Sequence, residues 1–212
     1  MKRIILSILI LLTVTSEIYS QPFPKKKYWF GCGFIYSNPQ REVQFGKWHA
    51  TGYEGNIYFR TVLRENLEFG VAAEYGIYTF DVEKYRKDKD FPATGETDHR
   101  ADVNNGSMFS IYQDIYMNAL PKFSKDLFFS FGLGYYRLVS KEGLYETFQV
   151  GEWHSVPIPG EILNSFGFNL GINYDQKIIF NRLNIVYEVR FHQLMFSQDL
   201  QQFLKFKIAF MF

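Results

Sequence analysis

The sequence has few of the features that cross-link or anchor a chain. Its 212 residues include a single cysteine, Cys32, so no disulfide forms within the chain and zinc sites built from paired cysteines are excluded. Acidic and basic residues nearly balance, at 22 and 23, and nothing indicates the basic surface that binds nucleic acid. After residue 20 there is no run of eighteen apolar residues, which excludes a transmembrane helix there.

Aromatic residues, in contrast, are abundant. The chain contains 23 Phe, 15 Tyr and 3 Trp, together 19% of its residues, although its mean hydropathy is only −0.18. A soluble core could use so many rings. A membrane barrel could also use them, because it needs an apolar outer band with aromatic interfaces and a polar interior. The pattern along the chain must therefore distinguish these two classes.

The first twenty residues are typical of a secretion signal. A positively charged start is followed by a mostly apolar run at residues 4–14, which is too short to span a bilayer. The next residues are more polar and end in the small residue Ser20. We expect residues 1–20 to be a cleaved signal peptide and residues 21–212 to form one mature domain. Because no cysteine follows the cleavage site, a lipoprotein anchor is not indicated.

The mature sequence divides into eight segments in which large apolar residues alternate with small, polar or charged ones. A period of two indicates a β-strand, whose successive side chains point to opposite faces. The last segment is the clearest, with Phe206, Ile208 and Phe210 on one face and Lys205 and Lys207 on the other. We expect strands at about residues 28–37, 53–60, 67–77, 109–118, 127–136, 166–174, 183–192 and 204–212.

The connections between these segments alternate in length. Long connections lie at about 38–50, 81–106 and 141–163, and short ones at about 64–66, 122–126 and 175–182. Outer-membrane barrels have an even number of antiparallel strands, short periplasmic turns and longer extracellular loops. The sequence therefore predicts an all-β fold, an antiparallel up-and-down transmembrane β-barrel of about eight strands in the cell outer membrane. The connection at 197–201 departs from the rule, because it would be short on the extracellular side.

The residue types of the two faces decide which one points outward. Roughly forty bulky side chains would overfill an eight-stranded interior, whereas they cover a lipid-facing cylinder well. The charged face must then line the lumen. Because unpaired charges are costly in a narrow, poorly hydrated space, we expect the inward charges to pair with one another. This predicted lumen network consists of Glu54, Arg60, Glu68, Glu74, Asp114, Glu188, Arg190, Lys205 and Lys207.

With its signal peptide, its eight alternating segments and its C-terminal run from Lys205 to Phe212, the chain resembles small outer-membrane barrels of the OmpA-like and OmpX-like kind. Phe212, with Phe210 two residues before it, is similar to the signal that the barrel-assembly machinery recognises, although Lys207 stands where that motif usually has Gly. The resemblance implies insertion by that machinery and contact with outer-membrane lipid and lipopolysaccharide. The frequent Tyr and Phe, with Gln21 after the cleavage site, are similar to Bacteroidetes-type proteins.

The sequence favours a structural or interaction protein with extracellular loops and a polar, largely plugged lumen, because eight strands rarely leave an open channel. A narrow pore is one alternative. Another is a lipid-modifying enzyme of the lipid A deacylase or acyltransferase kind, because His192 could orient a nucleophile such as Ser197. His154 and Ser155 are adjacent on an extended chain and point apart. A soluble lipocalin-like binder shares the strand count but needs an apolar lumen.

The long connections carry no recognisable site. The carboxylates at 81–106 lack the spacing of a calcium loop and are interleaved with bases, so we expect a solvated loop whose bases could contact lipopolysaccharide phosphates. Interfacial girdles, or alternatively a carbohydrate-binding stack, are expected from Trp29, Tyr36, Trp48, Tyr53, Tyr75, Tyr135 and Tyr174. We predict no catalytic residue, no cofactor and no metal site, and the sequence identifies no ligand for the extracellular loops.

Overall fold

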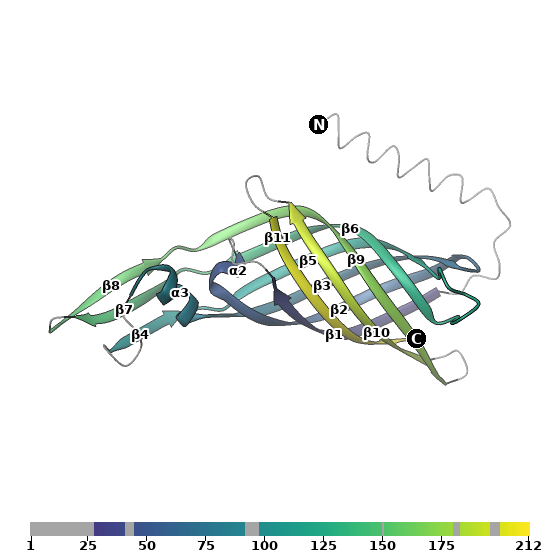
Figure 1. Cartoon of the computed structure of the whole chain (residues 1–212), viewed down its shortest axis with the longest axis horizontal. Helices are drawn as coiled ribbons and strands as arrows, with labels where there is room; N and C mark the ends of the chain where they lie inside the picture. The colour runs from purple at the N-terminus through teal and green to yellow at the C-terminus, as the bar shows by residue number, and fades with distance from the viewer. Residues whose placement is uncertain (1–27, 41–44, 92–97, 150, 180–182, 196–199) are drawn as a thin grey trace, which may run out of the picture.

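A computed structural model describes residues 28–40, 45–91, 98–149, 151–179, 183–195 and 200–212. The expected signal peptide lies outside these residues. Eight long strands form a closed antiparallel barrel in the order β1-β11-β10-β9-β6-β5-β3-β2, and Figure 1 shows them wound obliquely around one axis. The predicted fold class is therefore confirmed.

All eight predicted strands are present, and each extends beyond its predicted bounds at one end or both. The barrel strands are β1 (Tyr28–Pro39), β2 (His49–Arg64), β3 (Leu67–Phe80), β5 (Gly106–Met117), β6 (Leu127–Ser140), β9 (Glu161–Ile179), β10 (Leu183–Met195) and β11 (Leu200–Met211). The first and last strands pair antiparallel and close the barrel. Closure leaves none of the eight barrel strands with an unpaired edge. A bilayer requires this because hydrocarbon cannot hydrogen-bond the backbone.

The prediction that the two longest connections are loops is wrong for much of their length. They form a second sheet of three strands, β4 (His99–Val103), β7 (Gly143–Gln149) and β8 (Glu152–Ile158), in the order β4-β7-β8. Figure 1 shows this sheet projecting beyond the barrel, away from the C-terminus. We call this the sheet end and the opposite one the turn end. The small sheet was missed because both of its faces mix polar and apolar residues, which hides the alternation.

Two short helices, α2 (Phe45–Trp48) and α3 (Val82–Asp88), lie at the base of this sheet. Helix α3 begins after Asp81, whose side chain accepts a hydrogen bond of 3.0 Å from the backbone N–H of Lys84. Such a cap satisfies a backbone donor that has no partner within the helix. No helix in the described part of the chain is both long enough and apolar enough to cross a bilayer.

Successive residues of each barrel strand face outward and inward in turn. On β11, Phe206, Ile208 and Phe210 are 44%, 53% and 48% exposed. On the other face, Lys205 and Lys207 are only 2% and 5% exposed. The large apolar residues therefore face outward and the charged ones inward. A soluble lipocalin-like barrel would have the reverse arrangement.

The outward rows form an apolar belt around the barrel. Along β3 the row runs from Leu67 to Ile77, which at about 3.3 Å per residue and a tilt of about 40° covers roughly 25 Å of membrane thickness. Toward the sheet end, the outward positions on seven strands become polar. These rim residues are Thr51, Thr79, Ser107, Arg137, Asn164, Gln193 and Gln202. The belt therefore matches the hydrocarbon layer and ends where headgroups begin.

The aromatic residues expected in girdles divide into two sets. Tyr53, Tyr75 and Tyr174 face outward and are exposed, and Tyr36 and Tyr135 also face outward but are partly covered. Trp29 instead packs against an inner cluster, and Trp48 packs beneath the small sheet. The girdle prediction is thus wrong for both tryptophans, because Trp29 falls on the inward face of β1 and the folded connection covers Trp48.

Close approach at the seam predicts a glycine requirement. A Cβ atom at Gly33 would lie 2.4 Å from the Cβ of Ala209 on β11, whereas one at Gly55 would meet no atom within 4 Å. We expect Gly33→Val to lower the free energy of unfolding by about 1–3 kcal/mol. Gly55→Val, on the outer face, should be close to neutral. Urea unfolding in detergent micelles measures both, and equal midpoints for the two variants would contradict the seam packing.

Candidate functional site

Charged side chains line the inside of the barrel. The structure places all nine residues of the predicted lumen network on the inner face, where eight are buried and Glu68 is partly exposed. A tenth charged residue, Asp175, was missed because the sequence suggested a turn from this position. Strand β9 continues to Ile179 and carries Asp175 into the lumen. The ten residues form three contact groups.

The group nearest the sheet end is centred on Lys205. Its Nζ lies 2.8 Å from Oε2 of Glu54 and 2.7 Å from Oε2 of Glu74. The hydroxyl of Tyr78 donates a hydrogen bond of 2.5 Å to Glu54, and that of Tyr112 donates to Glu74. One ammonium group therefore joins two carboxylates from different strands, and each carboxylate has a further phenol donor.

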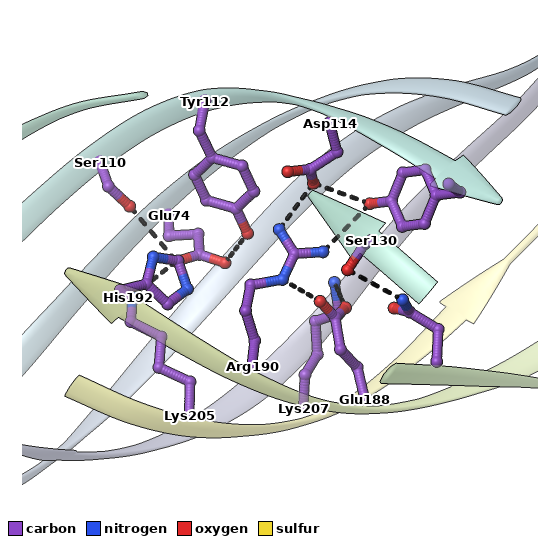
Figure 2. Close-up of polar contacts among 12 residues, drawn as sticks. Glu74, Ser110, Tyr112, Asp114, Ser130, Glu188, Arg190, His192, Lys205 and Lys207 are labelled. Carbon is purple, nitrogen blue, oxygen red and sulfur yellow. Dashed lines mark hydrogen bonds and ion pairs between the residues drawn. The ribbon is translucent and has the colours of Figure 1, made fainter. Parts of the chain in front are cut away.

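The second group is centred on Arg190, as Figure 2 shows. Its Nη1 lies 2.6 Å from Oδ2 of Asp114, and its Nε contacts Glu188. Lys207 also contacts Glu188, and the hydroxyl of Tyr116 donates a hydrogen bond of 2.9 Å to Asp114. These residues come from β5, β10 and β11, so the group connects opposite walls of the lumen.

The third group is centred on Arg60, near the turn end. Its Nη1 lies 2.9 Å from Oδ2 of Asp175, and its Nε lies 2.6 Å from Oε2 of Glu68 in an ion pair without hydrogen-bond geometry. The guanidinium group also lies over the rings of Tyr116 and Phe128, 4.0 and 4.7 Å from their centroids. Ring faces attract such a cation, so Arg60 is held by both charge and stacking.

The lumen groups contain more acids than bases. The six acids are Glu54, Glu68, Glu74, Asp114, Asp175 and Glu188, and the four bases are Arg60, Arg190, Lys205 and Lys207. Arg60, Arg190 and Lys205 each contact two acids. Each of these bases is thus shared by two carboxylates, and tyrosine hydroxyls donate further hydrogen bonds to the carboxylates. These contacts offset the desolvation that makes buried charges costly.

The tyrosines of the lumen are the partners that the sequence analysis underestimated. Tyr112 and Tyr116 alternate with apolar residues on β5 and fall on the same face as Asp114. Tyr78 reaches Glu54 from the neighbouring strand β3. The alternation of inward and outward residues along each strand already places these tyrosines on the inward face. They were missed because only charged residues were assigned to the network.

Two apolar clusters fill the lumen on either side of the central charges. The cluster toward the sheet end consists of Phe45, Tyr78, Met108, Tyr136, Leu138, Leu194 and Phe203. Phe45 enters it from α2, with its ring 5.2 Å from that of Tyr78 in an edge-on contact. The other consists of Tyr58, Ala72, Tyr112, Val186, Ala209 and Met211. A cavity of about 20 Å³ beside Phe45 and His49 has room for about one water.

His192, the candidate orienting residue of a lipid-modifying enzyme, is buried in the lumen. Its Nδ1 lies 2.8 Å from the hydroxyl of Tyr136. Ser197, the nucleophile weighed for it, lies outside the described residues. The hydroxyl of Ser155 donates a hydrogen bond of 3.0 Å to Glu146. Among the described residues, no group of three or more His, Cys, Asp or Glu is arranged to hold a metal ion.

The small sheet has a hydrophobic cluster of its own. Buried Phe80, Tyr85, Tyr145 and Ile158 form its centre, and Trp48 packs against them. Burial raises the pKa of both tyrosine hydroxyls. The cluster joins the small sheet to α3 and to Phe80 at the end of β3, so the sheet is packed onto the barrel.

Asp88 fastens the two short helices together. It forms an ion pair of 2.8 Å with Lys47 and accepts a hydrogen bond of 3.2 Å from the indole N–H of Trp48. The hydrogen bond from Lys47 holds the pKa of this carboxyl below its ordinary value. The connection between β1 and β2 is thereby tied to the connection that follows β3.

Comparisons with known proteins identify the fold. No protein-family model and no curated protein matches the chain. The N-terminal β-barrel domain of OprF from Pseudomonas aeruginosa is 11% identical with a TM-score of 0.50, and the match covers 89% of this chain and 100% of that one. The fold is that of a small outer-membrane β-barrel.

Two further solved structures were found. A major outer membrane protein from Thermus thermophilus is 11% identical with a TM-score of 0.48, covering 88% of this chain and 100% of that chain. Ail from Yersinia pestis is 9% identical with a TM-score of 0.47, covering 88% and 98%. The closed barrel and its apolar belt are those of a protein that spans the outer membrane.

The geometry at Lys205 predicts a large effect of removing its charge. Lys205→Met leaves Glu54 and Glu74 buried without their shared cation, and we expect it to lower the free energy of unfolding by about 3–5 kcal/mol. The matched control is Lys177→Met, which removes a half-exposed partner of Asp126 and should change it by at most about 1 kcal/mol. Urea unfolding in lipid vesicles compares the two. Similar losses for both variants would contradict the shared-cation arrangement.

Proposed function

We propose that the small sheet lies on the extracellular side, where the long connections of such barrels are found, that the barrel does not conduct, and that it holds this sheet as a rigid interaction surface. The filled lumen carries this proposal. Ion pairs between strands three or four apart cross the lumen at three levels, and Phe45 packs among Tyr78 and Phe203 at the mouth nearest the small sheet. An eight-stranded barrel has just enough interior to be filled by side chains. The lumen network is then a structural device that fixes strand register.

The extracellular sheet suits an interaction role because one face is anchored and the other is open. Tyr145 points into the cluster above the barrel, whereas Leu144 and Trp153 are exposed on the opposite face. On that face the guanidinium group of Arg100 lies 4.2 Å from the ring centroid of Trp153. Exposed aromatic and apolar groups beside charges are typical of protein and ligand contact surfaces.

The proposal includes two membrane partners. Phe210 and Phe212, which face outward in the folded barrel, would serve as the recognition signal for the barrel-assembly machinery in the unfolded chain. After folding, Phe212 and Phe30 exchange backbone hydrogen bonds of 2.8 and 2.9 Å, so the same residues complete the seam. The bases of α3, among them Arg86 and Lys87, would contact lipopolysaccharide phosphates.

Planar-bilayer recordings test the closed lumen. We expect the folded protein to insert without large, stable conductance steps, because side chains occupy the lumen from the central charges to Phe45. Insertion is verified by the heat-dependent gel migration of closed barrels, and a porin in the same membrane serves as the positive control. Sustained porin-like conductance of the wild-type protein would overturn the closed-lumen proposal in favour of a pore.

Limited proteolysis tests the rigid sheet. Intact cells displaying the wild-type protein should resist trypsin at Arg100 and Lys141, because packing holds the small sheet. We expect Tyr145→Ala, which removes a fully buried ring, to permit rapid cleavage. Trp153→Ala changes the open face and should stay resistant. Cleavage of the wild-type sheet as fast as that of the Tyr145→Ala variant would argue against a rigid surface.

A further inference from the structure

One residue interrupts the lipid-facing rows in the middle of the membrane. Gln113 occupies an outward position at the centre of β5. Phe109 and Ile111 precede it on the same face, Ile115 and Met117 follow it, and all four are exposed. The other described outward positions between the rim residues and the turn end are apolar or aromatic, with few exceptions: Cys32, Asn38, Gly55, Thr61 and Gln176. Asn38 and Gln176 lie toward strand ends, so a single carboxamide faces the centre of the hydrocarbon layer.

This carboxamide has no partner within the barrel. Among the described residues, none forms a hydrogen bond with the Gln113 side chain. Its register partners across the strands are Val71 and Leu133, which offer no polar side-chain atom. Gln113 is four positions from both Phe109 and Met117, which in a tilted strand corresponds to about 10 Å along the membrane normal. Its side chain is too short to reach either interface. An amide in hydrocarbon without a hydrogen-bond partner is unfavourable.

We propose that the face formed by β3, β5 and β6 around Gln113 is the interface of a homodimer in the membrane. All copies of a barrel insert with the same orientation, so a twofold axis between two copies is parallel to the membrane normal. Such an axis places Gln113 of both copies at the same depth. Because a carboxamide both donates and accepts, the two side chains form a reciprocal pair of N–H···O hydrogen bonds.

The side chains around Gln113 suit this contact. Val71 and Ala73 on β3 are small, so they keep the two strand surfaces from being held apart. Leu133 on β6 and Ile111 add apolar contact area on the other side. An interface of this kind depends on close packing and on hydrogen bonds, because burial from lipid supplies no hydrophobic driving force. The second copy satisfies an amide that lipid leaves unpaired.

Disulfide cross-linking tests the proposal directly. The native Cys32 is replaced with Ser, Val71→Cys is introduced beside an intact Gln113, and the protein is oxidised in phospholipid vesicles at low protein density. We expect covalent dimers in the Val71→Cys variant. The matched control is Ile208→Cys on β11, four strands from β5 around the barrel, and wild-type Cys32 on β1 is a second control. Both controls should remain monomeric.

A second measurement tests whether the hydrogen bonds between the two Gln113 side chains strengthen the association, or whether the two faces only lie close together. Energy transfer between labelled copies in the same vesicles gives the association constant for wild-type protein and for Gln113→Leu. We expect roughly a three- to twenty-fold weaker association for Gln113→Leu. Val189→Leu, a lipid-facing change on β10, should leave it unchanged. Folding of every variant is verified by heat-dependent migration.

Three outcomes would overturn the homodimer. The first is that Val71→Cys forms no more dimer than Ile208→Cys. The second is that Gln113→Leu associates as strongly as wild type. The third is that Val71→Cys, oxidised in native outer membranes, links to a different protein and not to a second copy. The cross-linking result stands independently of the conductance result, because a closed and an open barrel can present the same outer face.

Discussion

The lipid bilayer offers no water to hydrogen-bond a polar group, and this constraint organises the whole molecule. It requires the β1–β11 seam, because any unpaired strand edge would leave backbone groups without partners. It also sets the two faces of every strand, with apolar rows such as Phe206, Ile208 and Phe210 outward. The charged residues that remain must lie inside and satisfy one another, which the groups around Lys205, Arg190 and Arg60 do.

The interior and the small sheet are stabilised in different ways. In the lumen, Lys205 joins β11 to Glu54 on β2 and Glu74 on β3, which are not its neighbours in the barrel. Beyond the membrane, water is available and the sheet relies on a small apolar cluster around Tyr145 instead. The small sheet is therefore held on the barrel by packing and not by shared buried charges.

Much of the barrel could be predicted because its pattern is local. Alternation along 204–212 identified β11 and its orientation, and the same argument placed Arg190 and Glu188 inside. Asp175 was missed because a strand end has no clear local signal, and an aspartate there resembles a turn residue. The sheet β4-β7-β8 was missed because both of its faces mix polar and apolar residues, and because β4 pairs with a strand about forty residues away, which alternation does not report. In the sequence Gln113 is only a polar residue in an otherwise apolar row, and its depth and missing partner become visible only in the structure.

The orientation of the two strand faces is tested most directly by a nitroxide scan along residues 204–210 of the protein in lipid bilayers. Each site is assayed for contact with oxygen, which concentrates in hydrocarbon, and with a water-soluble relaxing agent. Oxygen contact should rise at 204, 206, 208 and 210 and fall at each position between them. The opposite phase, or no alternation, would contradict a barrel with an apolar exterior and a charged interior.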